Sequence, residues 1–269
     1  MSNVTDDTRD LLAVYDKQLR GVFPNPSAGV SWEQDGPLLR VVGRTQGLIT
    51  GPRDVGVRGS DLQHMINRQR DYFAEREMAV EWRTHHHDEP EELPAYLQAA
   101  GFASEEAKTV LIGHTAEIAA ETALPNGVTL RRVTADADMH RIAAMEATVW
   151  GDGWEWLGDH LIARIAAAPA DTAVLVAEAG CEVVCAAWLV IKPGSDFAGL
   201  RGGTTLPEWR GRGVYRALVA ARAKIAAARG LTYLHVDASD DSAPILRRLG
   251  FHAVTSTTSY VWTPTRTDN

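Results

Sequence analysis

The stretch Pro207-Glu-Trp-Arg-Gly-Arg-Gly-Val-Tyr-Arg216 decides the fold of the second half of this chain. It lies between a strand-like run that stops at Pro207 and a segment whose apolar residues recur at helical spacing from Val214 to Ile225. Its glycines permit a tight turn that points several N–H groups one way, where the helix begins with unsatisfied amides and a positive dipole end. Such a loop suits an anion, and a pyrophosphate above all, with three arginines adding charge-assisted contacts. A solvated basic turn is the alternative.

Regular elements can be placed on both sides of this loop from the spacing of apolar residues. Strands are expected at 128–133, 172–177, 182–191, 203–206 and 233–236, with two more within 251–262. Helices are expected at 136–149, in the Ala-rich run before Pro169, at 214–229 and at 243–249. The order β-α-α-β-β-β-α-β-α-β-β predicts a sheet with helices packed against it.

The loop and its neighbours resemble the GNAT superfamily of N-acyltransferases. That family's coenzyme loop reads Arg/Gln-x-x-Gly-x-Gly/Ala, and this chain reads Arg210-x-x-Gly213-x-Tyr215. Thr204-Thr-Leu-Pro207 looks like the family's coenzyme-facing strand with its terminal proline. Ser242 to Phe251 looks like its closing helix with a Gly-Phe ending, and the element order fits across residues 126–264.

The resemblance implies an α/β (α+β) fold of the GNAT acyl-CoA N-acyltransferase type, with a mixed, mostly antiparallel sheet flanked by helices. It also implies acetyl-CoA as cosubstrate and no metal. Ser239 stands where the family often has an asparagine that contacts pantetheine. The residues expected to bind the coenzyme are Thr204, Thr205, Arg210, Gly211, Arg212, Gly213, Val214, Tyr215, Arg216 and Ser239.

Two positions depart from the family pattern and leave the catalytic residues open. Tyr215 stands where a small residue is usual, so its ring must point away from the phosphates, and Leu246 stands where a general-acid tyrosine is common. Direct transfer to an amine needs one group to take the amine's proton and another to protonate the departing thiolate. The expected catalytic residues are Ser242, Tyr215 and His235 as donors, with Glu155, near Glu146, Asp152 and Asp159, as a carboxylate for the amine.

The first half of the chain repeats part of this pattern in a weaker form. Its expected order is strand, helix, strand, helix, Gly-Phe, strand, and Leu97-x-x-x-Gly-Phe102 echoes Leu246-x-x-x-Gly-Phe251. We therefore expect a degenerate GNAT-like domain over residues 1–125 and the acetyltransferase domain over residues 126–269. The stretch equivalent to the coenzyme loop, residues 50–60, lacks the basic glycine spacing, so we expect that half not to bind coenzyme.

Composition excludes several other classes of protein. The net charge of −8 disfavours nucleic-acid binding, while seven basic residues against one acidic residue between Arg201 and Gly230 favour a single anionic ligand. The apolar runs are too short for a membrane span and the polar start lacks a signal peptide, so we expect a cytoplasmic protein. Adjacent histidines on a strand point to opposite faces, so His85-His-His87 predicts a polar loop rather than a metal site.

The function expected from the resemblance is transfer of an acetyl group from acetyl-CoA to a primary amine of a small-molecule or amino-acid-like acceptor. A catalytically quiet acyl-CoA-binding or regulatory protein is the alternative, because of Leu246 and the degenerate first half. The tryptophans at 150, 154 and 156 either line the acceptor pocket or cover the core. Whether the first half closes the acceptor site, forms a homodimer interface or only packs is left open.

Overall fold

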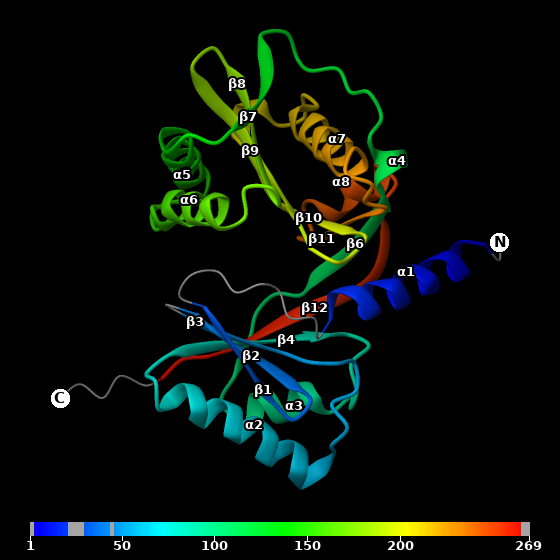
Figure 1. Ribbon diagram of the computed structural model, residues 1–269, viewed down its shortest axis with the longest axis vertical. Coiled ribbons are helices and arrows are strands. Elements are labelled where there is room, and N and C mark those ends of the chain that lie inside the picture. The colour runs from blue at the N-terminus through cyan, green and yellow to red at the C-terminus, as the bar shows by residue number, and fades with distance from the viewer. Residues whose placement is uncertain (1–2, 21–29, 44–45, 265–269) are drawn as a thin grey trace. The chain divides into compact units, whose positions relative to one another are not determined.

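A computed structural model describes residues 3–20, 30–43 and 46–264 of the chain (Figure 1). Contacts divide the chain into two compact units, each assembled from more than one stretch. The first unit comprises residues 1–111, 237–244 and 253–269, and the second comprises residues 112–236 and 245–252. These units are defined by contacts in space, whereas the domains 1–125 and 126–269 were predicted from a repeat in the sequence. The predicted domain boundary therefore stays a prediction.

The first unit is a sheet with strand order β1-β2-β3-β4-β12. Its neighbours are antiparallel except for β3 and β4, which are parallel, and β5 adds to β12. The strands are β1 (Ser31–Asp35), β2 (Leu38–Val42), β3 (Gln46–Thr50), β4 (Ala79–His85), β5 (Ala103–Ser104) and β12 (His252–Trp262). The helices are α1 (Asn3–Leu19), α2 (Gly59–Ala74) and α3 (Leu93–Ala99), and Figure 1 shows α2 and α3 on one side of the sheet.

The core of the first unit follows from the apolar stripes of these elements. Leu62, Ile66 and Phe73 recur along α2 and are fully buried against the sheet. Trp82 on β4 packs edge-to-face on Phe102, with ring centroids 6.4 Å apart. This apolar cluster accounts for a stable fold of the first unit without any ligand.

The histidines at 85 and 87 belong to a polar cluster that joins α1 to the end of β4. The hydroxyl of Tyr15 lies 3.1 Å from Nε2 of His85, and Nε2 of His87 lies 2.9 Å from the Asp16 carboxylate. Arg20 follows α1 and its guanidinium lies 2.6 Å from the carboxylate of Asp88, with both side chains less than a tenth exposed. The sequence predicted a polar loop here. His86 and His87 lie in the turn after β4 as expected, whereas His85 is the last residue of the strand and is buried because its ring packs against Tyr15.

The second unit contains a sheet with strand order β7-β8-β9-β10-β11. Its neighbours are antiparallel except for β10 and β11, which are parallel. The strands are β7 (Val128–Val133), β8 (Thr172–Ala179), β9 (Glu182–Ile191), β10 (Phe197–Thr205) and β11 (Tyr233–Ala238), and β6 (Lys108–His114) begins in the first unit and ends in this one. The helices are α4 (Thr115–Ile118), α5 (Asp136–Trp150), α6 (Trp156–Ala167), α7 (Val214–Ala227) and α8 (Ala243–Arg248).

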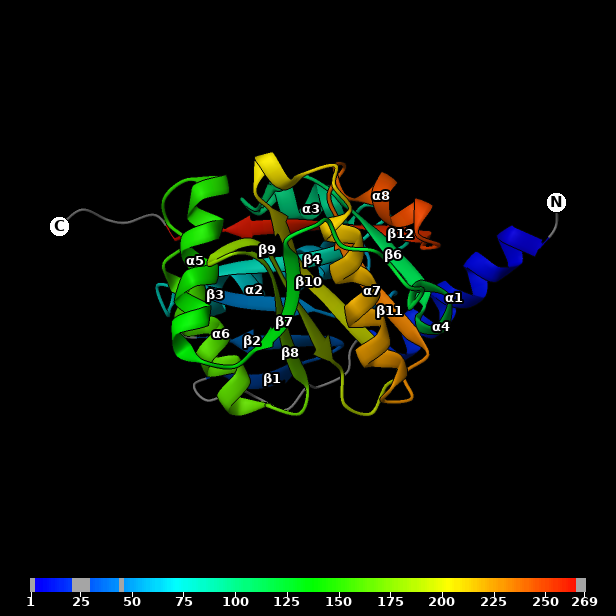
Figure 2. The ribbon, with the colours of Figure 1, turned by 90° about the horizontal axis from the view of Figure 1, so that it is seen from above.

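Helices cover both faces of this second sheet. In Figures 1 and 2, α5 and α6 lie on one side of β7, β8 and β9, and α7 lies on the other. Arg131 on β7 and Arg141 on α5 both donate to the carboxylate of Asp138, which ties α5 to the edge of the sheet. The last turn of α5 and the first turn of α7 are the parts of these helices that matter for the site below.

The internal repeat predicted from the sequence has a geometric counterpart. In each unit one parallel strand pair is joined through a helix: β3-α2-β4 in the first and β10-α7-β11 in the second. The amide of Phe102 donates to the carbonyl of Leu97 at 3.1 Å, and the amide of Phe251 donates to the carbonyl of Leu246 at 3.1 Å. The glycines between have φ of 92° and 97°, a left-handed conformation that ends a helix without a Cβ clash. The two Leu-x-x-x-Gly-Phe motifs are therefore the same helix ending.

Three expected elements differ from the structure. The strand expected at 203–206 runs from Phe197 to Thr205, and the two strands expected within 251–262 are one strand, β12. The first strand of the N-terminal half was expected to run without a break from Leu38 to Ile49. The structure instead has two antiparallel strands there, β2 and β3. Residues 44–45 lie outside the described part of the chain.

The fold class expected from the sequence is confirmed: both sheets are mixed, mostly antiparallel and flanked by helices. Over the described residues, none of the helices has the length and apolar character needed to cross a bilayer.

Candidate coenzyme site

The loop between β10 and α7 leaves its backbone amides available. A short 3-10 turn over Pro207–Trp209 is followed by Gly213, which has φ 84° and precedes the first residue of α7. The first helical hydrogen bond runs from the amide of Ala217 to the carbonyl of Gly213 at 3.0 Å. Within the described residues, no main-chain carbonyl accepts a hydrogen bond of ordinary geometry from an amide of residues 211–216. This is the arrangement that binds a phosphate at a helix N-terminus.

The three arginines of the loop are spread around these amides. Arg210 donates from Nε to the carbonyl of Thr205 at 3.1 Å, so its guanidinium is held beside the end of β10. The Arg212 guanidinium lies 5.0 Å from the centre of the Trp209 ring, a cation–π contact. A Cβ placed on Gly213 would lie 3.9 Å from a terminal nitrogen of Arg216, which puts that charge at the start of α7. The loop thus combines free donors with positive charge.

The ring of Tyr215 points into the protein and away from the loop. It lies against Gly203, where an added Cβ would come within 2.6 Å of the ring. Burial raises the pKa of the Tyr215 hydroxyl. The ring orientation agrees with the expectation from the sequence, since a tyrosine in this motif leaves the anion side of the loop open.

The end of β10 carries the two threonines expected to face the coenzyme. Its pairing with β9 shifts register between Gly202 and Thr204, a bulge that re-aims the last residues of the strand. The hydroxyl of Thr205 is buried and lies 3.1 Å from Sγ of Cys185. Burial raises the pKa of the Cys185 thiol to about 11, so this cysteine packs as a neutral thiol. Thr204 points to the opposite side and accepts a hydrogen bond at 3.2 Å from the indole N–H of Trp150.

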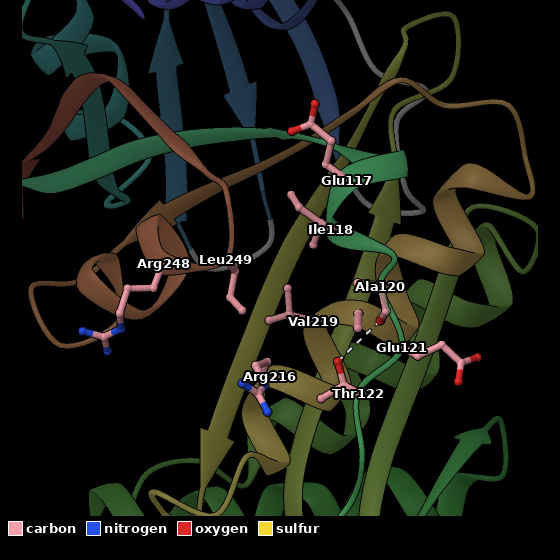
Figure 3. A pocket seen from close by; sticks show the side chains of 10 residues that line it. Glu117, Ile118, Ala120, Glu121, Thr122, Arg216, Val219, Arg248 and Leu249 are labelled. Atoms are coloured by element: carbon pink, nitrogen blue, oxygen red, sulfur yellow. Dashed lines mark hydrogen bonds between the residues drawn. The ribbon is translucent and has the colours of Figure 1, made fainter.

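A cavity of about 310 Å³ lies beside the coenzyme loop, between the segment 117–122, α7 and the end of α8. Its volume is at the lower end of the roughly 300–1,000 Å³ usual for ligand pockets. Figure 3 shows Arg216 and Arg248 at this cavity, with Glu121 and Thr122 on the segment across from Arg248. Arg216 belongs both to the loop and to the cavity, so the two are continuous.

A buried carboxylate, Glu146, lies on the other side of the sheet and is the residue that sequence reasoning undervalued. It is 2% exposed, one turn before Trp150 on α5. Burial raises the pKa of Glu146, and hydrogen bonds from Thr204 and Trp150 only partly oppose this. The signal was present in the sequence, because position 146 continues the apolar stripe formed by Met139 and Ile142.

The remaining expected site residues, three catalytic ones and the pantetheine contact Ser239, fall in different places. His235 on β11 belongs to the second unit and stacks edge-on against Phe197, with centroids 6.1 Å apart. Glu155 is exposed at the start of α6 in the same unit. Ser239 and Ser242 belong to the first unit, where their hydroxyl oxygens are 3.2 Å apart. The roles expected for these four residues stay predictions.

The tryptophans of the α5–α6 segment are an exposed aromatic group. Trp150 and Trp156 are 58% and 56% exposed, and the rings of Trp154 and Trp156 stack with centroids 6.1 Å apart. The sequence left open whether these tryptophans line the acceptor pocket or cover the core. Because Trp150 and Trp156 are more than half exposed, these two do not cover the core.

The equivalent loop of the first unit is occupied by the protein's own carboxylate. Before α2, the side chain of Asp54 accepts a hydrogen bond from the amide of Gly56 at 2.8 Å and one from Arg58 at 2.9 Å. The hydrogen bond from Arg58 is the main cause of the lowered pKa of Asp54. Asp54 therefore places a carboxylate of the protein itself at this loop, where it engages one amide and Arg58, while the start of α2 has no side-chain cap. That this half binds no coenzyme stays a prediction.

Comparison with known proteins gives a consistent result for the segment that contains the loop and for the fold. The acetyltransferase (GNAT) family model matches residues 137–251, which include β10, the loop and α7. No curated protein matches the chain in sequence.

Three solved structures illustrate the likeness of the whole chain. A GCN5-related N-acetyltransferase from Kribbella flavida is 18% identical, with TM-score 0.65 over 97% of this chain and 96% of that one. A tandem GNAT protein from the clavulanic acid biosynthesis pathway, without AcCoA, is 12% identical, with TM-score 0.65 over 99% and 97%. A GCN5-related N-acetyltransferase from Sphaerobacter thermophilus is 14% identical, with TM-score 0.59 over 95% and 85%.

At such identities these likenesses show the fold alone, and the tandem protein supports a duplicated fold. The family-model match spans the loop and its flanking elements. The segment 137–251 of this chain is therefore identified as a GNAT acetyltransferase domain, a type of domain that transfers acyl groups from acyl-CoA.

Proposed function

We propose that this protein is an N-acetyltransferase that uses acetyl-CoA and a primary amine of a small-molecule or amino-acid-like acceptor. One observation carries the proposal: among the described residues, no main-chain carbonyl accepts a hydrogen bond of ordinary geometry from the amides of residues 211–216, which lie at the start of a helix and among three arginines. A diphosphate fits this cradle, because both the donors and the charges are already in place. No metal takes part in the proposed reaction.

The residues of the chain would bind, orient and move protons. When bound, acetyl-CoA supplies the acetyl group as a thioester. The loop would hold the diphosphate, and the main chain near Thr205 would orient the thioester carbonyl through N–H donors. Ser242, Tyr215 and His235 are the proposed proton donors for the departing thiolate, and Ser239 the proposed contact to pantetheine. Glu155 is a proposed carboxylate for the cationic acceptor.

Turnover measurements with a panel of amines test the proposal. The purified chain should bind acetyl-CoA by calorimetry and release free thiol only when a suitable primary amine is present. Binding without thiol release on any amine would favour a quiet acyl-CoA-binding protein instead. Failure to bind acetyl-CoA at all would contradict the assignment of the loop.

The cavity beside the loop supports a place for the nucleotide end of the coenzyme. Arg216 and Arg248 both line this cavity and would be the residues to hold the 3′-phosphate of the adenosine. We expect Arg248→Ala to weaken CoA binding about tenfold, the loss of one charge-assisted contact of about 1.5 kcal/mol. The affinity for 3′-dephospho-CoA should hardly change.

The adjacent Arg247 is a matched control, because it is equally exposed on α8 but does not line the cavity. Arg247→Ala should keep the preference of the wild-type protein for CoA over 3′-dephospho-CoA. Equal effects of the two substitutions, or equal binding of the two ligands by the wild type, would contradict this placement.

The first unit should not contribute to coenzyme binding. Arg58 is engaged by Asp54 at 2.9 Å, so its charge is compensated within the protein. We expect Arg58→Ala to leave the dissociation constant for acetyl-CoA unchanged in calorimetry. A large loss of affinity would mean that both halves contact the coenzyme.

A further inference from the structure

Glu146 is a buried carboxylate without a counter-ion in the part of the chain that the structure describes. Ion pairs are formed by the other buried acids, for example Asp138 with Arg131 at 2.8 Å, but none reaches Glu146. An unpaired buried charge lowers the stability of the folded state, so proteins retain one mainly where it has a function. Glu146 is 2% exposed and has only neutral hydrogen-bond donors, Thr204 and Trp150.

Glu146 lies beside Thr204, near the end of strand β10. The indole N–H of Trp150 donates to the hydroxyl of Thr204 at 3.2 Å. Both side chains lie beside the Glu146 carboxyl, where they lower its pKa against the effect of burial. Cys185 on β9 lies near Glu146: burial is the main cause of the raised pKa of its thiol, and the Glu146 charge adds to it. The last turn of α5 thus holds a proton acceptor against the strand that precedes the coenzyme loop.

We infer that Glu146 is the general base that takes the proton from the acceptor ammonium. This inference rests on the proposed function and names a residue for one of its steps. An ammonium is an N–H donor like the Trp150 indole, so it can take the place of Trp150 beside the Glu146 carboxyl and donate to that carboxyl. Trp150 is 58% exposed and can give way at the surface.

The proton and bond changes balance without a further reactant. The ammonium gives one proton to the Glu146 carboxylate and becomes a neutral amine. The amine nitrogen forms a bond to the carbonyl carbon as the carbon–sulfur bond breaks, and the second proton of the nitrogen ends on the thiolate sulfur. Glu146 then releases its proton to water, so the products are the acetylated amine, CoA thiol and one proton.

The substitution Glu146→Gln tests the inference, with Glu182→Gln, an exposed glutamate at the start of β9, as the matched control. We expect kcat/KM at neutral pH to fall about 10²–10⁴-fold in Glu146→Gln, the usual contribution of a general base. Acetyl-CoA affinity should stay within twofold of wild type. Activity of the variant should recover as pH rises and the free amine becomes more abundant, whereas Glu182→Gln should follow the wild-type profile.

A second measurement separates catalysis from structure. The pKa of Glu146 is raised in the folded protein, so ionisation of this group costs stability as pH rises from the ordinary glutamate pKa through the raised one. Glu146→Gln removes that cost, and its Tm should exceed that of wild type above this range and match it below. Glu146→Asp keeps a carboxylate and should retain the acid limb of the pH profile with reduced kcat.

The outcomes distinguish this inference from the proposed function. If wild type acetylates an amine and Glu146→Gln does so equally well, the base assignment is overturned while the proposed function stands. If Glu146→Gln is not stabilised at high pH, Glu146 is not an uncompensated buried charge and the inference also fails. If wild type turns over no amine, both the inference and the proposed function are overturned.

Discussion

The Gly213→Glu variant should lose acetyl-CoA binding, with a dissociation constant raised at least about 100-fold. Gly213 has φ 84°, so any side chain strains the turn that aims the amides of the loop. A carboxylate there also places a negative charge among the donors. Loss of two charge-assisted hydrogen bonds, at about 1.5–3 kcal/mol each, is sufficient for this effect, since about 1.4 kcal/mol is tenfold.

Gly180→Glu is the matched control for this prediction. Gly180 also has positive φ, at 60°, with open space around it, and it lies in the turn between β8 and β9 of the same unit. Calorimetry should find its acetyl-CoA affinity unchanged, and Gly213→Ala should fall between the two. Undiminished affinity in Gly213→Glu would show that the loop does not hold the diphosphate.

Asp88→Ala should lower the free energy of unfolding by about 3 kcal/mol, the lower end of the roughly 3–5 kcal/mol for breaking a buried ion pair. The pair of Arg20 and Asp88 is 2.6 Å long, and the side chains are 5% and 9% exposed. Removing the carboxylate leaves Arg20 buried, although it still donates to the carbonyls of Gly51 and Pro52. Denaturant unfolding monitored by circular dichroism measures the change.

The pH dependence of that loss has a defined sign. Burial alone would raise the pKa of Asp88, but the His85 hydrogen bond and the Arg20 charge lower it overall. The carboxylate therefore stabilises the fold fully above the unfolded pKa of about 3.9, and this contribution disappears as pH falls through the lower folded value. The exposed pair of Asp71 and Arg70 is the control, and Asp71→Ala should change stability by less than about 1 kcal/mol. Equal effects of Asp71→Ala and Asp88→Ala would contradict the role assigned to the buried pair.

The second half of the fold could be predicted because its signals are local. Helix α7 has a regular apolar stripe and a glycine at each end, and the structure begins it at the expected Val214. Strand β10 is longer than the expected 203–206, although it contains Gly199, Gly202 and Gly203, a residue type that usually interrupts a strand. Here His235, Trp188 and Tyr215 lie close to those glycines, so the absent side chains make room for tertiary contacts that sequence spacing does not reveal.

The coenzyme loop of the candidate site could be predicted from the sequence, whereas the proposed general base, Glu146, could hardly be predicted. The anion cradle is contiguous in sequence, so glycine and arginine spacing was sufficient to find it. Glu146 depends on burial under Trp150 and on contact with Thr204, which is far away in the sequence. A carboxylate on an apolar stripe is its only local signature, and the same signature fits an ordinary surface residue at the edge of a helix.

Asp54 gives the first unit an internal substitute for a ligand's phosphate. A chain with two related halves could take up two coenzyme molecules, but in the first unit the Asp54 carboxylate engages the Gly56 amide and Arg58 and adds a negative charge to the loop. Titration with CoA should accordingly reach equivalence at one molecule per polypeptide, and excess CoA should produce no second heat. We therefore expect one coenzyme site per chain rather than two sites that bind cooperatively.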